Sequence, residues 1–183
     1  GIIISIIFLL RYYDKMEIQK FLKGKVTIIG MGNPLKGDDN AGNIIVKKLM
    51  EIVKSDKVNF LVVEEGIENF IGKIERLKSD NIIIVDAVNF KGKIGEIRIF
   101  YPDQLMKNST TTHSFSLPDL LSIYNFKKCL IIGIQPGNLS FGTEISKEVK
   151  ESIDKIVLLL AKYLTSQTER RIYGKNKNQN RRN

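Results

Sequence analysis

Short apolar runs and amphipathic segments alternate along most of the chain from Val26 onward. Five runs have the composition or the alternating pattern of strands, at 25–32, 58–66, 81–88, 95–102 and 128–136. Apolar residues recur at helical spacing, or follow a proline near a helix start, at 39–55, 70–79, 117–124 and 145–164. Strands that alternate with helices predict a layered α/β domain with a largely parallel sheet. Because the 95–102 run alternates apolar and polar residues, we expect it to be an edge or antiparallel strand.

The two ends of the chain do not follow this pattern. The opening run "GIIISIIFLL" is shorter than the ~20 residues that a membrane-spanning helix needs, and it lacks the flanking features of a secretory signal. We expect residues 1–15, which precede Met16, to lie outside the functional domain; an added strand or a membrane-surface anchor are the alternatives. The closing segment "ERRIYGKNKNQNRRN" has almost no apolar residues and is predicted to be disordered. The chain therefore divides into an N-terminal extension, 1–24, a single α/β domain, 25–164, and a basic tail, 165–183.

The formal net charge of +9 is concentrated at these two ends. Residues 1–25 contribute +3 and residues 169–183 contribute +5, so the domain between them is nearly neutral. A basic patch is what nucleic acids and acidic membranes recognise, and here the charge lies outside the domain. We therefore expect neither nucleic acid nor a membrane as a partner. A non-catalytic module whose tail binds RNA or an acidic protein is the alternative that this tail supports.

The chain has one cysteine, Cys129, and one histidine, His113. A single cysteine excludes an internal disulfide and a zinc site built from several cysteines of one chain. Because Cys129 lies in an apolar run, a buried and unreactive thiol is favoured over a nucleophile. The sequence therefore predicts a protein of a reducing, cytoplasmic compartment.

Polar residues gather where the predicted strands end. In open α/β sheets, ligands bind at the carboxyl ends of the strands. The first strand is followed by "GMGNPLKGDDNAG" (30–42) and the last by "GIQPGNLSFG" (133–142). Asp86 and Asn89 follow the third strand, and His113 lies in the loop after the fourth. We expect a functional site at this edge of the sheet.

The loop from Gly30 to Gly42 allows two interpretations. Glycines between a strand and a helix are typical of a phosphate-binding loop. A nucleotide- or phosphate-binding α/β enzyme is therefore the alternative function. However, the glycine spacing breaks the dinucleotide fingerprint, and no Walker lysine–serine pair is present. Asp38 and Asp39 fall at the predicted helix start, where two carboxylates would repel an anion. These two residues either cap the helix, which would stabilise it by ~1 kcal/mol, or take part in a functional site.

Asp86 ends an apolar strand, where burying a lone carboxylate is costly without a partner or a cation. A lysine or a helix N-terminus could neutralise it, so a structural role stays open. Asp39, Asp86 and His113 together offer two oxygens and one nitrogen, a set that suits a borderline divalent metal such as zinc or nickel. Many α/β domains contain two aspartates and a histidine, so residue type alone does not identify the site.

Four blocks of the chain, in one order, are similar to a single protein family. They are "GMGNPLKGDDNAG", "IIIVDAVNFKGKIGEIRIF", "TTTHSFSL" and "LIIGIQPGNLSFGTEISKEVKESI", and the similarity covers about residues 25–164. The chain resembles the hydrogenase maturation proteases, the nickel-dependent endopeptidases that finish the large subunits of [NiFe]-hydrogenases. Within them, it resembles most the branch that serves formate-hydrogenlyase-type complexes.

This resemblance implies a three-layer α/β fold with a twisted, mostly parallel five-stranded sheet and helices on both faces. It also implies that Asp39, Asp86 and His113 bind a metal and serve the cleavage reaction. The metal is the nickel already inserted in the substrate, although other divalent metals can occupy the site. The protease then removes the C-terminal extension of its partner, the large-subunit precursor, only after nickel is in place.

Two parts of the chain depart from the family pattern. The family has glycine directly after the second acid of the first loop, where this chain has Asn40, a residue that tolerates left-handed backbone conformations. The second loop, "EEGIENF", keeps only Gly66, Glu68 and Asn69 of a segment rich in glycine, threonine and serine. This change bears on substrate contacts and leaves the three metal ligands in place. For Asp38 we expect a supporting or capping role, and we expect the protein to act as a monomer.

Overall fold

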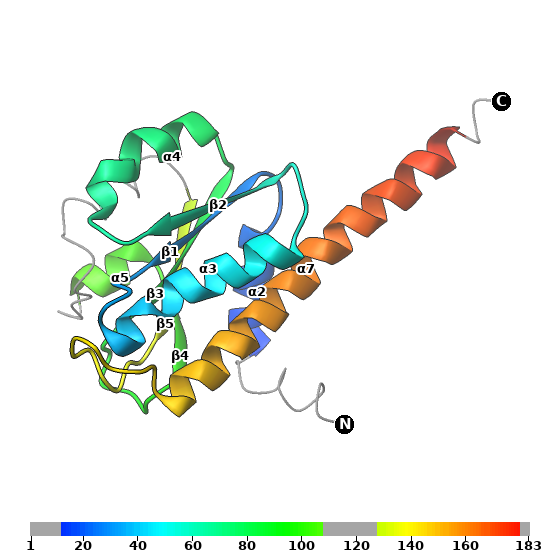
Figure 1. The fold of residues 1–183 in the computed structure, drawn as a ribbon. Coiled ribbons are helices and arrows are strands. Elements are labelled where there is room, and N and C mark those ends of the chain that lie inside the picture. The colour runs from blue at the N-terminus through cyan, green and yellow to red at the C-terminus, as the bar shows by residue number, and fades with distance from the viewer. Residues whose placement is uncertain (1–11, 108–127, 180–183) are drawn as a thin grey trace, which may run out of the picture.

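The computed structural model describes residues 12–107 and 128–179, and one five-stranded sheet forms the centre of the molecule (Figure 1). In spatial order, the strands are β2 (Val58–Val63), β1 (Val26–Met31), β3 (Asn81–Ala87), β5 (Lys128–Ile134) and β4 (Ile97–Phe100). The first four are parallel, and β4 runs antiparallel to β5 at the edge. The predicted α/β fold and the predicted antiparallel edge strand are both confirmed. The helix predicted at 117–124 lies outside the described residues.

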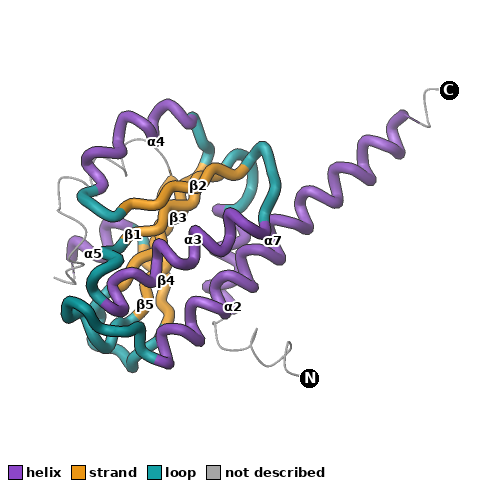
Figure 2. The backbone as a smooth tube through the Cα atoms, viewed as in Figure 1, coloured by secondary structure: helices purple, strands orange, loops and turns teal. Residues whose placement is uncertain are grey.

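Helices cover both faces of this sheet, as the purple helices on either side of the orange strands show (Figure 2). One face carries α2 (Tyr12–Phe21), α3 (Ala41–Ile52) and α7 (Lys147–Gln179). The other carries α4 (Ile71–Leu77) and α5 (Pro102–Lys107). Two short 3-10 turns, η1 (Gly37–Asn40) and η2 (Ile67–Phe70), directly precede α3 and α4. The three-layer arrangement is the one that the sequence predicted.

The central strands are buried on both faces because their side chains alternate between the two helix layers. In β3, Ile83 and Val85 belong to the core beneath α3 and α7, whereas Ile82 and Ile84 belong to the core beneath α4 and α5. All residues of β3 are buried, which accounts for its unbroken apolar run. The same alternation places Asp86, two residues after Ile84, on the α4 and α5 side of the sheet.

Helix α2 lies in the segment that the sequence assigned to an N-terminal extension. Ile18 and Phe21, with Leu22 directly after the helix, are buried in the core that α3 and α7 also form. The helix begins at Tyr12, before Met16, so residues expected to lie outside the domain are part of an element packed on it. The expectation differs from the structure because one short set of apolar residues is too brief to be recognised as helical periodicity.

Helix α7 continues to Gln179, beyond the 145–164 segment in which the sequence shows helical periodicity. Its first turns pack on the sheet and α3 through residues such as Val149 and Ile153. The last turns, orange to red in Figure 1, project away from the body of the molecule. The tail was expected to be disordered because it has no apolar face to bury; the structure continues the helix through residues whose helix propensity is mostly favourable. No helix in the described part of the chain is both long and apolar enough to cross a membrane.

Candidate functional site

The first loop, between β1 and α3, packs against the end of β3 through close backbone contacts. Gly32 has a φ of +145°, and a side-chain carbon there would lie 1.7 Å from the carbonyl oxygen of Asp39. A side-chain carbon on Gly42 would lie 2.0 Å from the carbonyl oxygen of Val85 in β3. Only glycine permits such approaches. They hold η1 and the start of α3 beside the carboxyl end of β3, so the structure places Asp39 and Asp86 at one edge of the sheet.

Asp39 lies in η1 and is buried, with 5% of its surface exposed. Its Oδ2 accepts a hydrogen bond from the backbone amide of Asn33 at 2.9 Å, and its own amide donates to the Lys36 carbonyl at 2.9 Å. No described residue donates a hydrogen bond to Oδ1. The carboxylate is therefore fixed by its own loop through one oxygen, while the other oxygen is available to a ligand.

Asp38 has a different role: it is fully buried and joins the first loop to the loop after β5. Its Oδ2 accepts hydrogen bonds from the backbone amides of Gly137 at 2.7 Å and Asn138 at 2.9 Å. Ser146, the residue before α7, donates its amide to Oδ1 at 2.6 Å and its hydroxyl to Oδ2 at 2.7 Å. The negative charge thus lies at the N-terminus of α7, where the helix dipole stabilises it. This is the supporting role that the sequence led us to expect.

Neither aspartate caps α3. The residue before α3 is Asn40, and no side chain makes a capping hydrogen bond there. The interpretation of Asp38 and Asp39 as caps of this helix is wrong, because both residues lie within η1, before Asn40, and their side chains bind other partners. Asn40 has a φ of −79°, so this position does not require the left-handed conformation, which Gly37 adopts instead with a φ of +41°. The Asn40 Oδ1 is buried and has no hydrogen-bond partner among the described residues.

Asp86 is fully buried and pairs in register with Gly133 of β5. Helix α5 packs on the same side of the sheet through Leu105 and ends at Lys107, six residues before His113 in the sequence. His113 itself lies outside the described residues. Within those residues, no three His, Cys, Asp or Glu side chains group as a metal site. The structure thus brings two of the three predicted ligands to one edge and does not describe the third.

The first loop is not built as a phosphate cradle. A side-chain carbon on Gly30 would lie 2.3 Å from the carbonyl oxygen of Gly42, so this glycine serves the packing of α3 on β1. The space at Gly32 is likewise filled, by the backbone of Asp39. Two buried aspartate side chains in this loop, Asp38 and Asp39, would also oppose a bound anion. The geometry argues against the nucleotide- or phosphate-binding alternative.

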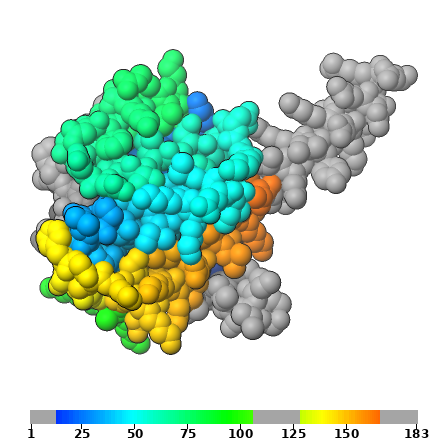
Figure 3. Space-filling view, in the orientation of Figure 1, coloured from blue at the N-terminus to red at the C-terminus, as the bar shows by residue number. Residues whose placement is uncertain are grey.

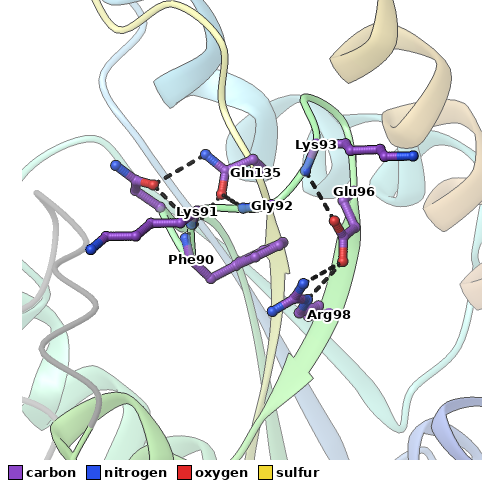
Figure 4. A network of polar contacts seen from close by, with 8 residues as sticks. Phe90, Lys91, Gly92, Lys93, Glu96, Arg98 and Gln135 are labelled. Carbon is purple, nitrogen blue, oxygen red and sulfur yellow. Dashed lines mark hydrogen bonds and ion pairs between the residues drawn. The ribbon is translucent and has the colours of Figure 1, made fainter.

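Sequence reasoning missed Gln135, a buried amide directly after β5 (Figure 4). Its Oε1 accepts hydrogen bonds from the backbone amides of Phe90 at 2.9 Å and Gly92 at 3.0 Å. Its Nε2 donates to the Oδ1 of Asn89 at 3.2 Å. Gln135 therefore holds the loop that follows Asp86. A glutamine that continues an apolar strand was the available signal, because a buried amide requires hydrogen-bond partners.

A second set of contacts fixes the far end of the same loop (Figure 4). Glu96 accepts hydrogen bonds from the Lys93 backbone amide at 3.0 Å and from the Arg98 guanidinium at 2.7 Å. These two donors lower the pKa of the Glu96 carboxyl. The Arg98 guanidinium also lies over the Phe90 ring, 4.4 Å from its centroid. The loop between β3 and β4 is thus held at both ends by side-chain contacts.

Cys129 lies buried in β5, and burial raises the pKa of its thiol to about 12. A thiol with this pKa is not ionised at neutral pH, so the predicted unreactive cysteine is confirmed. The polar groups that the described residues present at this edge of the sheet are carboxylates and amides rather than a thiolate.

The loops after β1 and β5 form one continuous surface at the carboxyl edge of the sheet. The Gly142 amide donates to the Leu35 carbonyl at 2.8 Å, and the Lys36 ammonium lies 4.7 Å from the centroid of the Phe141 ring. Figure 3 shows the two loops, blue and yellow, side by side. Leu35 and Phe141 are 65% and 68% exposed. These two apolar side chains give the edge a surface that a protein substrate can contact.

Several known proteins with similar sequences are named as hydrogenase maturation proteases. The family model described as hydrogenase maturation protease matches residues 44–163, which include Asp86 and His113 and begin after Asp39. A candidate hydrogenase maturation protease of Methanocaldococcus jannaschii is 34% identical over 145 residues, covering 73% of this chain and 84% of the relative. The hydrogenase 3 maturation protease of Escherichia coli K12 is 29% identical over 134 residues, covering 70% of this chain and 84% of the relative.

Solved structures with the same fold carry similar names. The [NiFe] hydrogenase maturation protease of Thermococcus kodakarensis KOD1 has a TM-score of 0.72 at 30% sequence identity, covering 81% of this chain and 99% of that one. The hydrogenase maturating endopeptidase of Escherichia coli has a TM-score of 0.62 at 25% identity, covering 79% and 93%. Because nearly all of each solved chain is matched, the similarity concerns a whole domain rather than one motif.

Proposed function

Because the chain belongs to the hydrogenase maturation protease family, and is therefore a peptidase, we propose that it removes the C-terminal extension from a [NiFe]-hydrogenase large-subunit precursor after nickel insertion. In this proposal, Asp39, Asp86 and His113 bind the nickel that the precursor carries. The observation that carries it is the placement of the Asp39 and Asp86 carboxylates at one edge of the sheet, in a chain of this family.

The chemistry of the first loop supports the role of Asp39. Its Oδ2 is held by the Asn33 amide, and no described residue donates a hydrogen bond to its Oδ1. The neighbouring Asn40 adds a buried Oδ1 without a hydrogen-bond partner among the described residues. Oxygen ligands combined with an imidazole suit nickel and zinc. The loop is therefore suited to a cation and poorly suited to an anion.

The position of α5 supports the role of His113. The side chain of Asp86 belongs to the side of the sheet on which α5 packs, and α5 ends at Lys107. His113 follows Lys107 by six positions in the sequence. At ~3.3–3.6 Å per residue, a fully extended chain of this length reaches at most about 20 Å, so His113 belongs to the neighbourhood of α5.

The proposed ligand set accounts for selection of the substrate. Two carboxylates and one imidazole form an incomplete coordination sphere, which holds a free metal less well than a nickel already bound by the precursor. The precursor without nickel lacks this interaction, so the difference in affinity between the two forms is the specificity. A metal at this position also polarises a carbonyl group or lowers the pKa of a water molecule, two roles that serve peptide hydrolysis.

We further propose that the protein acts as a monomer in the cytoplasm and that the nickel it recognises is carried by the substrate. Zinc or another divalent metal can occupy the same ligands in vitro. The single, buried cysteine is consistent with a reducing compartment, because no structural disulfide can form within the chain.

Processing assays on nickel-loaded precursor test the proposed function. Asp39→Asn, Asp86→Asn and His113→Ala are each expected to retain the fold, as judged by circular dichroism, and to abolish cleavage. Asp103→Asn is the matched control, because Asp103 is an exposed aspartate on α5 outside the proposed site, and it should cleave at the wild-type rate. Cleavage by all three site variants would overturn the assignment.

A further inference from the structure

We propose that the side-chain amide of Asn89 donates a hydrogen bond to a peptide carbonyl oxygen of the bound precursor, and that Gln135 positions this amide. The inference rests on the proposed function, since it names a substrate contact of the same site. It is carried by the hydrogen bonds around the two amides, which fix the orientation of both and leave the NH₂ group of Asn89 facing solvent.

The orientation of Gln135 follows from its partners. The backbone N–H groups of Phe90 and Gly92 both point at one end of the amide, at 2.9 and 3.0 Å, and an N–H group can only donate. That end is therefore the oxygen, Oε1. The other end is the NH₂ group, which donates to the Oδ1 of Asn89 and to the Pro136 carbonyl, each at 3.2 Å. Gln135 is buried, and its acceptor and donor groups are both occupied within the fold.

The orientation of Asn89 follows by the same argument. The Lys91 backbone N–H donates to its Oδ1 at 3.2 Å, as does the Nε2 of Gln135. Because two donors meet this atom, the oxygen and nitrogen of Asn89 cannot be exchanged. The Nδ2 of Asn89 has no acceptor among the described residues, and the residue is exposed. Its two hydrogens are thus held toward solvent, and a donor fixed before the substrate arrives loses little entropy on binding.

The position of this donor relates it to the proposed nickel ligands. Asn89 follows Asp86 by three residues, and Gln135 follows Gly133, the partner of Asp86 in register, by two. Figure 4 shows Gln135 beside Phe90 and Gly92, at the end of β5 where the loop crosses it. In the proposed site, the carboxylate oxygens of Asp39 and Asp86 serve as metal ligands, so these residues offer no hydrogen-bond donor to a peptide carbonyl. The Asn89 amide supplies the donor that these two residues lack.

Steady-state cleavage of nickel-loaded precursor by Asn89 variants tests the contact. Asn89→Asp keeps the acceptor for Gln135 and Lys91 but replaces the NH₂ group with an oxygen, so kcat/KM should fall by about 10- to 100-fold. Asn89→Ala adds no charge beside the nickel ligands and should lower kcat/KM by about 10-fold. Asn59→Asp is the matched control, because it makes the same change near the start of β2, at the opposite end of the strands, and should leave kcat/KM unchanged.

A double-mutant cycle tests whether Gln135 acts through Asn89. Gln135→Glu keeps the acceptor for the Phe90 and Gly92 amides but turns a second oxygen toward the Asn89 Oδ1. It should lower kcat/KM in the wild-type background and have no further effect in the Asn89→Ala background. An equal loss in both backgrounds would mean that Gln135 only supports the loop, and it would overturn the positioning role.

The outcomes separate this contact from the proposed function. If wild-type protein leaves nickel-loaded precursor uncut, the proposed function and the contact both fail. If wild-type protein cuts it and both Asn89 variants keep the wild-type kcat/KM, the contact alone fails.

Discussion

Ser146 donates two hydrogen bonds to the carboxylate of Asp38, one from its backbone amide at 2.6 Å and one from its hydroxyl at 2.7 Å, across 108 residues of sequence. Asp38 is the neighbour of Asp39, and Ser146 directly precedes α7. The contact ties the loop that carries one proposed nickel ligand to the start of the longest helix. The position of Asp39 therefore depends on a buried charge that we do not place in contact with the substrate.

Replacing Asp38 tests this connection. In Asp38→Asn, an NH₂ group would face backbone N–H donors of the loop after β5, so we expect the free energy of unfolding to fall by about 3 kcal/mol. Urea denaturation followed by circular dichroism measures the change. Asp154→Asn is the control, because the Asp154 side chain is 70% exposed on α7, and it should change stability by less than about 0.5 kcal/mol. Equal unfolding free energies for the two variants would contradict the supporting role.

We predict that Gly42 cannot be replaced, because its backbone lies too close to β3 to leave room for a side chain. A side-chain carbon there would lie 2.0 Å from the Val85 carbonyl oxygen, a backbone atom that cannot move aside cheaply. We expect Gly42→Ala to lose about 3 kcal/mol or more, or to fail to fold. Gly72→Ala, in α4, meets only the end of the flexible Arg76 side chain at 3.6 Å and should instead gain about 0.5–1 kcal/mol. Thermal denaturation of the two variants should therefore shift in opposite directions; two shifts of the same sign would refute the account.

The Tyr101 hydroxyl joins α2 to the end of β4, because it donates a hydrogen bond to the buried Glu17. This bond raises the pKa of Tyr101 to about 12. Tyr101→Phe keeps the ring beside Phe21 but removes the donor, so we expect a loss of about 1–2 kcal/mol. Tyr13→Phe is the control, because Tyr13 is an exposed tyrosine of α2, and it should leave the free energy of unfolding unchanged. If the two variants have the same midpoint of unfolding, α2 is not held by this bond.

The contact of Glu96 with Lys93 and Arg98 predicts a dependence of stability on pH. The Lys93 amide and the Arg98 guanidinium lower the pKa of Glu96 in the folded state, so its contribution is present above the unfolded pKa of ~4.3 and is lost as pH falls through the folded value. Wild-type protein should be more stable than Glu96→Gln at pH 7, and the difference should shrink below about pH 4.3. Chemical denaturation of both proteins between pH 7 and pH 3 measures this, and a constant difference would exclude the ionised contact.

The elements that the sequence predicted well are those whose burial repeats along the chain. Strand β3 follows from an unbroken apolar run, β4 from an alternating one, and α3 from apolar residues at helical spacing. Helix α2 was missed because its buried residues form one short set, and α5 because it is only six residues long. Local periodicity reports which face of an element is buried, and short elements supply too few repeats for this signal.

The site was predictable only in part, because its supporting contacts join distant segments. The ends of parallel strands bring Asp39 and Asp86 to one edge, and that follows from topology. The separate roles of Asp38 and Asp39 do not, because the partners of Asp38 lie about 100 residues away in the loop after β5. Gln135 was missed for the same reason, since its amide acts on the loop around Phe90, 45 residues earlier.

The central claim is that the protein recognises nickel in its substrate through Asp39, Asp86 and His113. The most direct test incubates wild-type protein with the same large-subunit precursor in nickel-loaded and nickel-free form and measures the intact mass of the product. We predict that only the nickel-loaded precursor loses its C-terminal extension, and that none is lost with Asp86→Asn. Equal cleavage of both forms, or cleavage of the loaded form by Asp86→Asn at the wild-type rate, would contradict the claim.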